Sequence, residues 1–478
     1  MENFWKFTKI TQKKENSILY SLLKEKDKQD LVWITDKEVL NANKVKSIVS
    51  NLRKYHHKEK ESRIAICIKN PLNLATMLIY GESFCETTLL LEPQLDEKLI
   101  LNFCKKSKCK TLFSDVENIL NSIRLNKNLK IKKINNLVKL NENNYSFEEL
   151  SNCNSSILTL TSGTSGKPKL MEHNFDTLTR TIRKNQKPNK LKWGLLYGLT
   201  KFAGLQVFLQ SFITSSELFL LDLSKPLDEN ISILKKNECN ALSATPTMFR
   251  KLLMHSNFSK LKLDQITLGG EIVDQKILDS LRKLFRKAKI THLYASTEAG
   301  VGFSVKDGLE GFPKEFLFNK NSSYVLKMSS KGNLLIKNLN ISDKRYLKSN
   351  EGNLNIDSKG FLDTGDKIKI QNERCIFLGR ENGTINVGGN KVQPEEIERV
   401  ILENPDVIAV SVRGKKSSMT GEIVLATITI KNMNVKNEIK KSIIRDFKSK
   451  KIESYKIPGI FKFNTEFKTN ESGKLVRS

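Results

Sequence analysis

The sequence has 478 residues, with 81 lysines and arginines against 52 aspartates and glutamates, so its formal net charge is +29. A chain of this length can bury a large core and usually forms several domains or subdomains. A composition of 38% hydrophobic and 28% charged residues excludes a disordered tail and a membrane-embedded protein, and the size excludes a small disulfide-stapled scaffold.

The positive charge has two interpretations. A nucleic-acid-binding protein is a remote alternative, because a large basic excess is typical of that class. The lysines, however, are spread along the whole chain, and Asn and Ile are abundant too. This pattern favours a general compositional bias with a solvated surface. We therefore expect no nucleic acid partner, although the excess attracts small polyanionic ligands.

The N-terminal stretch MENFWKFTKITQKKENS has no apolar core that would mark a secretory signal. The longest apolar stretch, Leu195–Leu223, is interrupted by polar residues such as Lys201 and Glu217, which favours buried helix and strand over a membrane span. Seven cysteines without a C-x-x-C pair indicate reduced, mostly buried thiols. We expect a cytoplasmic protein with no membrane span.

Between about residues 60 and 300, short apolar runs alternate with segments whose apolar residues recur at i, i+3 and i+4. This alternation predicts mostly parallel sheets that are covered by helices on both faces. Helices are predicted within 96–108, 229–238 and 274–287. The predicted strands are 63–68, 87–91, 111–114, 157–161, 218–223, 241–244, 266–268 and 290–294.

After about residue 320 the pattern changes to short hairpin strands with Gly and Asn turns, and a smaller α+β part follows. Its first helix is predicted to begin at Pro394, with two acidic residues next to it and Ile397 and Ile401 on one face. Strands near 408–412 and 423–430 and a helix near 439–447 complete this part.

The stretch Leu158–Leu170, LTLTSGTSGKPKL, joins an apolar strand to a turn of small and hydroxylated residues. Small residues let backbone N–H groups close around an anion, and the hydroxyls and lysines add donors and charge, as a triphosphate requires. It is no Walker loop, since no Gly stands five residues before Gly166 and Pro follows Lys167. The pattern favours a phosphate-binding loop over a surface turn. The predicted loop residues are Thr161, Ser162, Gly163, Thr164, Ser165, Gly166 and Lys169.

Five further motifs follow this loop in order, and together they resemble the adenylate-forming superfamily of AMP-binding enzymes. This superfamily includes acyl- and aryl-CoA synthetases, peptide-synthetase adenylation domains and luciferases, and the chain is most similar in style to the stand-alone acyl-CoA ligases. The motifs are LYASTEAG at 293–300, LDTGD at 362–366, GRENGTINVGGNKVQPEEIE at 379–398, SYKIP at 454–458 and NESGKLVR at 470–477.

The resemblance implies an α/β fold. A large N-terminal domain of doubly wound, mostly parallel sheets with a distorted β-barrel-like part is expected at 1–379. A hinge follows at 380–383. A small mobile α+β domain that carries the catalytic lysine is expected at 384–478.

The resemblance also assigns a nucleotide site. Tyr294 offers a flat face for adenine, and the turn with Gly270 and Glu271 resembles the one whose backbone lies along that base. Asp366 can accept both ribose hydroxyls, with Arg380 as a second ribose contact. Ala295 and Ser296 are the remaining residues implied for ATP.

Three residues match the positions that carry the family's chemistry. Thr297 can donate to the α-phosphate, and the hard carboxylate oxygens of Glu298 suit Mg²⁺. Lys474 would normally be a solvated lysine near a chain end, but in its motif it resembles the catalytic lysine. Its point charge would neutralise the charge that grows between an attacking carboxylate and the α-phosphate.

The implied reaction has two halves. A substrate carboxylate attacks the α-phosphorus of Mg·ATP, which gives an acyl-adenylate and pyrophosphate. The small domain then swings about a hinge that contains Asn382, takes Lys474 away and brings the loop of Gly388 and Gly389 to the site, so that a thiol can attack the acyl carbon.

The sequence departs from the family pattern at three positions. Asn382 stands where relatives often have Asp, Asn386 where Lys is usual, and Lys201 where many carry His. Lys201 either pairs with a second anionic group on the acid or faces water. The segment also lacks the Asp that holds an α-ammonium, which argues against amino-acid substrates. The candidate acyl pocket comprises Lys201, Phe202, Gly204, Thr245–Thr247 and Gly300–Gly302.

Because the sequence ends soon after Lys474, the thiol acceptor is expected to come from another molecule. Coenzyme A is the main prediction, since it is the commoner partner and its phosphates suit a positive field. A separate acyl-carrier protein is the alternative. A degenerate family member that binds nucleotide without chemistry is a further alternative. Degeneration would be expected to remove at least one of the key residues of the motifs, but all six are present: Thr164, Lys169, Glu298, Asp366, Arg380 and Lys474. The expected small molecules are thus a carboxylic acid, ATP with Mg²⁺, and coenzyme A.

Overall fold

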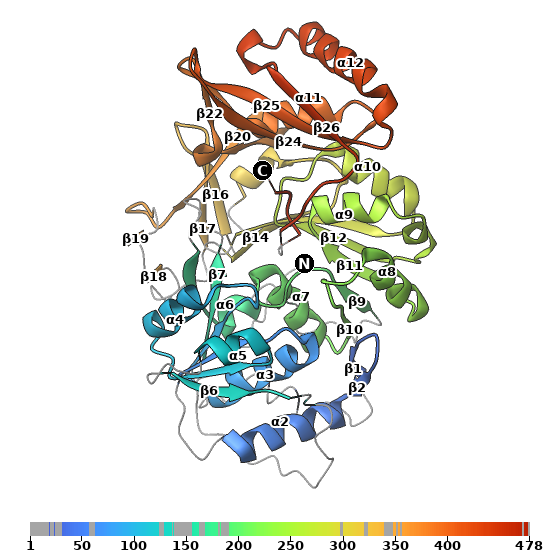
Figure 1. The fold of residues 1–478 in the computed structure, drawn as a ribbon. Coiled ribbons are helices and arrows are strands. Elements are labelled where there is room, and N and C mark those ends of the chain that lie inside the picture. The colour runs from blue at the N-terminus through green and yellow to red at the C-terminus, as the bar shows by residue number, and fades with distance from the viewer. Residues whose placement is uncertain are drawn as a thin grey trace, which may run out of the picture. The chain divides into compact units, whose positions relative to one another are not determined.

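A computed structural model describes residues 19, 23, 31–56, 63–123, 129–135, 137, 155–161, 168–179, 182, 191–296, 300–319, 324–338, 348–349, 352–353, 356–470 and 473–476. The chain folds into two compact units (Figure 1). The first comprises Met1–Thr161, Pro168–Lys190 and Phe208–Asp222, and the second comprises Ser162–Lys167, Leu191–Val207 and Leu223–Ser478.

The first unit contains a six-stranded sheet in the order β6-β5-β3-β4-β7-β8. Its strands are parallel except for the hairpin of β7 and β8, which aligns Thr161 with Lys169. The predicted phosphate loop therefore joins two antiparallel neighbours. The strands are β3 (Arg63–Cys67), β4 (Thr87–Leu90), β5 (Thr111–Ser114), β6 (Lys130–Lys133), β7 (Ser156–Thr161) and β8 (Lys169–Asn174).

Helix α3 (Pro71–Phe84) shows why these segments form helices. The side chain of Asn70 accepts the N–H groups of Leu72 and Asn73, and Pro71 occupies the first turn, where its missing donor is harmless. The helix is apolar around its circumference and is buried almost throughout. The unit also contains α2 (Ala42–His56), α4 (Glu97–Lys106), α5 (Glu117–Ile123), α6 (Phe175–Thr179), β1 (Leu31–Ile34), β2 (Val39–Asn41) and β10 (Glu217–Leu220).

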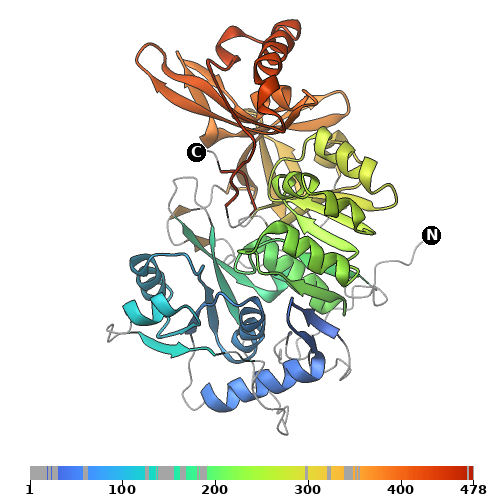
Figure 2. The same cartoon turned by 45° about the vertical axis from the view of Figure 1, so that its right-hand side comes forward.

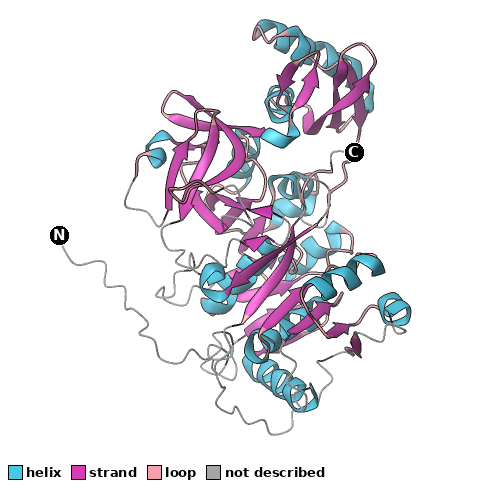
Figure 3. Ribbon diagram, turned by 90° about the vertical axis from the view of Figure 1, so that its left-hand side faces the viewer, coloured by secondary structure: helices cyan, strands magenta, loops and turns pink. Residues whose placement is uncertain are grey.

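The second unit contains strands in the order β14-β13-β12-β11-β9, all parallel except β14. Parallel strands bring their carboxyl ends to one edge, where ligands of such sheets usually bind. Figure 3 shows helices beside these strands. The elements are β9 (Lys192–Leu195), β11 (Ala241–Ala244), β12 (Gln265–Gly269), β13 (Lys289–Ser296), β14 (Gly300–Val305), α8 (Leu227–Lys236), α9 (Pro246–Leu253) and α10 (Gln275–Leu284). Helix α7 (Phe202–Ile213) begins in this unit and ends in the first.

An antiparallel sheet in the order β15-β21-β20-β17-β16 also belongs to the second unit. Its core includes Phe303, Phe312 and Ile368. Its strands are β15 (Phe312–Pro313), β16 (Tyr324–Met328), β17 (Asn333–Asn338), β20 (Leu362–Gln371) and β21 (Arg374–Arg380), and a small hairpin is formed by β18 (Lys348–Ser349) and β19 (Gly352–Asn353). Short 3₁₀ turns lie at Ser256–Lys260, Lys314–Leu317, Glu381–Gly383, Met433–Val435 and Ser454–Lys456.

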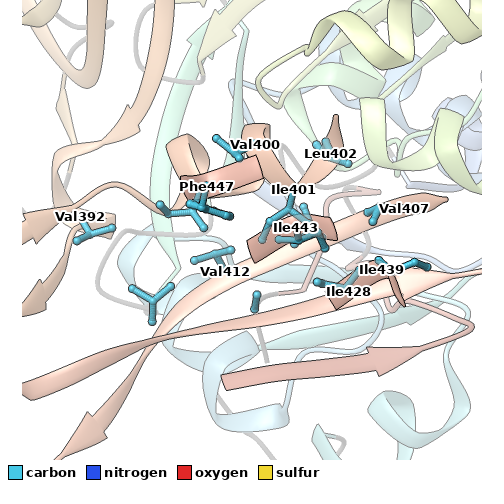
Figure 4. Close-up of a cluster of buried hydrophobic side chains, with 14 of the residues drawn as sticks. Val392, Val400, Ile401, Leu402, Val407, Val412, Ile428, Ile439, Ile443 and Phe447 are labelled. Atoms are coloured by element: carbon cyan, nitrogen blue, oxygen red, sulfur yellow. The ribbon is translucent and has the colours of Figure 1, made fainter. Parts of the chain in front are cut away.

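The C-terminal α+β part has a hydrophobic core of its own. Apolar residues of α11 (Pro394–Leu402) and α12 (Lys436–Ser449) pack with those of β24 (Val407–Ser417) and β25 (Gly421–Ile430). Figure 4 shows this cluster, in which Phe447 and Ile443 from α12 lie near Ile401 from α11. The remaining strands are β22 (Ile385–Val387), β23 (Asn390–Val392) and β26 (Ile460–Asn464), and β26 runs parallel to β25.

The predicted strands and helices form within a few residues of the expected bounds, and α11 begins at Pro394 as predicted. The boundary at 380–383 stays a prediction, because the two units divide the chain elsewhere. The six cysteines among the described residues are buried and form no disulfide bond. Within those residues no helix combines the length and apolarity that crossing a bilayer requires. A cytoplasmic location stays a prediction.

The C-terminal core yields a stability prediction. Phe447 is completely buried, so Phe447→Ala should lower the free energy of unfolding by about 3–5 kcal/mol. Urea unfolding followed by circular dichroism measures this loss, with the exposed neighbour Lys448→Ala as the matched control. A loss equal to that of the control would contradict the packing described.

Candidate active site

A cavity of about 270 Å³ lies in the second unit. Six predicted nucleotide residues line it: Gly270, Glu271, Tyr294, Ala295, Asp366 and Arg380. They come from the ends of β12 and β13 and from the strands β20 and β21. Residues of α11 and β24, together with Leu475, complete the wall. The fold thus brings together positions that are up to two hundred residues apart in sequence.

Asp366 is held in one orientation from two sides. Its Oδ2 accepts the hydroxyl of Tyr294 at 2.6 Å, and its Oδ1 accepts Nε of Arg380 at 2.9 Å. Asp366 and Arg380 face each other across β20 and β21. The Asp366 side chain is 13% exposed and that of Arg380 is 52% exposed, so the carboxylate lies inside and the guanidinium at the rim. The predicted ribose pair is preorganised.

The ring of Tyr294 is parallel to two phenylalanine rings. Its centroid lies 5.1 Å from that of Phe303 and 5.4 Å from that of Phe377. Burial, and next the charge of Asp366, raises the pKa of the Tyr294 hydroxyl well above its usual value, so that it stays a donor. Tyr294 was predicted as a platform for adenine, and this role stays a prediction, because the structure shows its ring stacked with Phe303 and Phe377. What the structure does show is that its hydroxyl orients Asp366.

Lys474 lies beside the glycine turn after β12. Gly270 has a φ of +83°, which favours glycine, and a β-carbon placed there would lie 3.5 Å from Cε of Lys474. The predicted catalytic lysine and the predicted adenine turn are therefore adjacent.

Glu271 uses its carboxylate to join two segments. Oε2 accepts the backbone N–H of Thr247 at 3.0 Å, and Oε1 accepts that of Leu475, also at 3.0 Å. The first N–H lies in the opening turn of α9, where it has no partner within the helix and the dipole favours an anion. The carboxylate thus fixes the residue that follows Lys474.

The segment around Lys474 is a tight turn on α9. Asn470 accepts the N–H of Gly473 at its carbonyl (2.8 Å) and that of Lys474 at Oδ1 (3.0 Å). Thr245, the N-cap of α9, donates its hydroxyl to the carbonyl of Gly473. Gly473 has a φ of +70°, which a residue with a side chain rarely adopts. Figure 2 shows this dark red segment beside the yellow-green helices of the same unit.

The predicted hinge is an exposed 3₁₀ turn that includes Asn382. The predicted thiolation loop is the turn between β22 and β23, where Gly388 and Gly389 have φ of +58° and +86°. Such a two-residue turn requires positive φ at both positions and so favours glycine. Asn386, which stands where relatives carry Lys, accepts the N–H of Gly389 at 3.0 Å. Asn386 therefore stabilises the turn through this hydrogen bond.

Three predicted acyl-pocket residues lie at the start of α7. Phe202 is buried, Lys201 is half-buried, and a β-carbon on Gly204 would meet the carbonyl of Gly198 at 2.2 Å. Gly204 thus permits close packing of the helix. Gly300 begins β14 and pairs with Ser296 at the end of β13.

Several predicted residues lie outside the described part of the chain. They are Ser162, Gly163, Thr164, Ser165 and Gly166 of the phosphate loop and the pair Thr297 and Glu298. Thr161 and Ser296 are placed in strands without a described side chain, and Lys169 belongs to the first unit. Across the described ranges no group of three or more His, Cys, Asp or Glu is arranged to hold a metal.

Sequence reasoning missed the contacts that hold the C-terminal segment. Thr245 and Thr247 were assigned to the acyl pocket, yet the structure places Thr245 on Gly473 and the N–H of Thr247 on Glu271. Lys251 also donates to Thr469, at 2.9 Å. No local pattern links residues so far apart in sequence, so a single sequence carries no signal for these pairs.

The family model of AMP-binding enzymes matches residues 43–324, and the model of the AMP-binding enzyme C-terminal domain matches residues 396–474. The 2-succinylbenzoate–CoA ligase of Bacillus subtilis is 26% identical over 340 residues, which are 67% of this chain and 67% of the relative.

Two solved structures share the fold. The anthranilate CoA ligase AuaEII, in complex with anthranoyl-AMP, has a TM-score of 0.79 at 17% identity and covers 96% of this chain and 95% of its own. The o-succinylbenzoate coenzyme A synthetase of Bacillus subtilis, in complex with ATP and magnesium, has a TM-score of 0.72 at 19% identity, with 97% and 98% covered. The predicted family, fold class and enzyme class, an AMP-forming acid–thiol ligase, are confirmed.

The contact between Tyr294 and Asp366 yields a binding prediction. Tyr294→Phe removes a hydrogen bond to a charged group and should weaken AMP binding about tenfold, since Asp366 is then oriented by Arg380 alone. Calorimetric titration with AMP measures the effect. Tyr324→Phe, in the neighbouring sheet, should leave the affinity unchanged. Equal affinity for Tyr294→Phe and wild type would contradict the role of the hydroxyl.

Proposed function

The chain belongs to the AMP-binding enzyme family, and we propose that it converts a carboxylic acid and ATP into an acyl-adenylate and pyrophosphate and then transfers the acyl group to coenzyme A. The observation that carries the first half-reaction is the position of Lys474 beside Gly270, next to the cavity with Asp366 and Arg380.

Adenylation needs position and charge more than covalent chemistry from the protein. Asp366 and Arg380 would hold the ribose, and the turn at Gly270 would lie along the base. Lys474 would then place its ammonium between the acid and the α-phosphate, where negative charge gathers as the carboxylate attacks. Glu271 supports this role, because it fixes the backbone at Leu475.

Magnesium would accompany ATP as a Lewis acid. Mg²⁺ usually takes one or two carboxylates together with phosphate oxygens and water, so a single carboxylate suffices and Glu298 has the suitable chemistry. Thr297 would donate to the α-phosphate, and the loop 161–166 with Lys169 would bind the phosphates.

Coenzyme A is the proposed acceptor for two reasons. The relatives described above are CoA ligases, and a net charge of +29 attracts the phosphates of coenzyme A. The turn of Gly388 and Gly389, which is exposed, would line the path of the thiol. Loading of a carrier protein is the alternative outcome of the acceptor test.

An aromatic acid with a second carboxylate is the proposed substrate class. The relative from Bacillus subtilis is named for 2-succinylbenzoate, and Lys201 supplies a cation at the start of α7, where the acyl pocket is predicted. A lysine would pair with the second carboxylate of such an acid.

ATP–pyrophosphate exchange with Mg²⁺ tests the first half-reaction. Wild type should catalyse exchange with at least one acid from a panel of fatty, aromatic, hydroxy and dicarboxylic acids, and Lys474→Ala should lower the rate at least about a hundredfold. Lys468→Ala, an exposed lysine in the same segment, is the matched control. Exchange that survives in Lys474→Ala would refute the role of this lysine. Addition of coenzyme A or a carrier protein to the active mixture identifies the acceptor.

The role of Lys201 is tested by substrate preference. Lys201→Ala should lower kcat/KM about tenfold for an aromatic dicarboxylic acid and leave kcat/KM for its monocarboxylic analogue unchanged, because only the first loses an ion pair. Steady-state kinetics with the two acids measures the ratio. An unchanged ratio would place Lys201 outside the acyl pocket.

A further inference from the structure

Lys276 lies in the first turn of α10 and reaches out of its own helix. Its Nζ donates to the carbonyls of Asn404 (2.7 Å), Pro405 (3.3 Å) and Val407 (2.7 Å). A lysine in the first turn opposes the helix dipole, and that turn of α10 contains no acidic residue. Within the helix, the N-cap Asp274 attracts this cation, and the three carbonyls outside the helix give its ammonium hydrogen-bond partners.

The acceptors belong to the turn that joins α11 to β24. The end of a helix leaves carbonyl groups without partners and carries partial negative charge, which suits a cation. An ammonium has three donors and no acceptor, so three carbonyls satisfy it completely. Leu402 and Val407, on the two sides of this turn, belong to the core of the C-terminal α+β part. Lys276 thus binds a turn that is anchored on both sides in the core of that part.

A second set of contacts holds the segment that carries Lys474. Glu271 accepts the N–H of Leu475, Thr245 donates to the carbonyl of Gly473, and Lys251 donates to Thr469. These contacts and the Lys276 contact fix different portions of the same α+β part: one fixes its core and the other its C-terminal segment. A further contact also holds the core of this part: Arg399 of α11 donates to the carbonyl of Phe377 at 2.9 Å and pairs with Glu310 at 3.5 Å. Loss of the Lys276 contact therefore removes one of the two contacts named here that hold the core.

We propose that Lys276 is a positioning residue that latches the C-terminal α+β part in the arrangement that holds Lys474 at the nucleotide cavity. The inference rests on the proposed function, in which Lys474 acts in adenylation and leaves the site before the thioester forms. Thioester formation needs the opposite movement, which takes Lys474 away. Removal of the latch should therefore slow the first half-reaction and spare the second.

Lys276→Met keeps most of the aliphatic stem and removes the donors. Its ATP–pyrophosphate exchange rate should fall at least tenfold, while the rate of thioester formation from supplied acyl-adenylate stays within twofold of wild type. Lys276→Arg, which keeps charge and donors, should recover at least a third of the exchange rate. Lys283→Met, an exposed lysine on the same helix, should change neither rate. An equal fall in both half-reactions, or an unchanged exchange rate, would overturn the proposal.

Amide hydrogen exchange tests the latch without catalysis. In Lys276→Met, peptides that contain Leu475 or the turn 404–407 should exchange at least tenfold faster, because the N–H of Leu475, which is bonded to Glu271 in this structure, would lose that partner when the latch opens. Peptides from β25 should not change. Unchanged exchange at Leu475, or faster exchange throughout the α+β part, would refute the latch. A wild type that is inactive with every acid would refute the proposed function and leave this measurement decisive for the latch.

Discussion

Both oxygens of the Glu271 carboxylate accept backbone N–H groups, one from Thr247 and one from Leu475. The first belongs to the opening turn of α9, where the N–H has no helical partner, and the second to the residue after Lys474. A carboxylate that binds two backbone donors fixes both chains without dependence on side-chain identity. Glu271, which follows Gly270, therefore fixes the position of Lys474 through the backbone of Leu475 and links it to the start of α9. This constraint places Lys474 beside the other residues of the predicted nucleotide site.

The parallel sheet explains why the remaining members meet. The strands β11, β12 and β13 end at one edge, and the loops after them carry Thr245, Gly270 and the segment after Tyr294. The antiparallel sheet adds Asp366 and Arg380 as a cross-strand pair. Register places that pair side by side, and the hydroxyl of Tyr294 links it to the parallel sheet at 2.6 Å. This side of the cavity is thus built from strands whose side chains are already hydrogen-bonded to one another.

The sequence predicted the elements, and its motifs marked six residues that line one cavity, because both are encoded locally. Apolar periodicity marks the strands and amphipathic helices, and motifs such as LDTGD mark the turns. It did not predict the contacts of Lys276 or the double task of Glu271. Such pairs join residues more than a hundred positions apart through backbone carbonyls and N–H groups, which every residue except proline offers in full. Any side chain at 404 or 475 would present the same atoms, so no residue pattern reveals them.

The C-terminal α+β part has a stable hydrophobic core, and the polar contacts that attach it to the rest of its unit are weaker. Its core buries residues such as Ile401, Ile443 and Phe447, whose truncation typically costs about 2–5 kcal/mol each. The hydrogen bonds at Lys276 and Glu271 involve charged groups, and such bonds contribute about 1.5–3 kcal/mol each. They are few, and water can replace them when they break. The hydrophobic core is therefore more stable than the polar contacts that attach this part. When those contacts break, the part would move away from the turn at Gly270 while it stays folded. A catalytic lysine carried on such a body can be removed from the site without loss of the fold, which is what an enzyme with two successive half-reactions in one site requires.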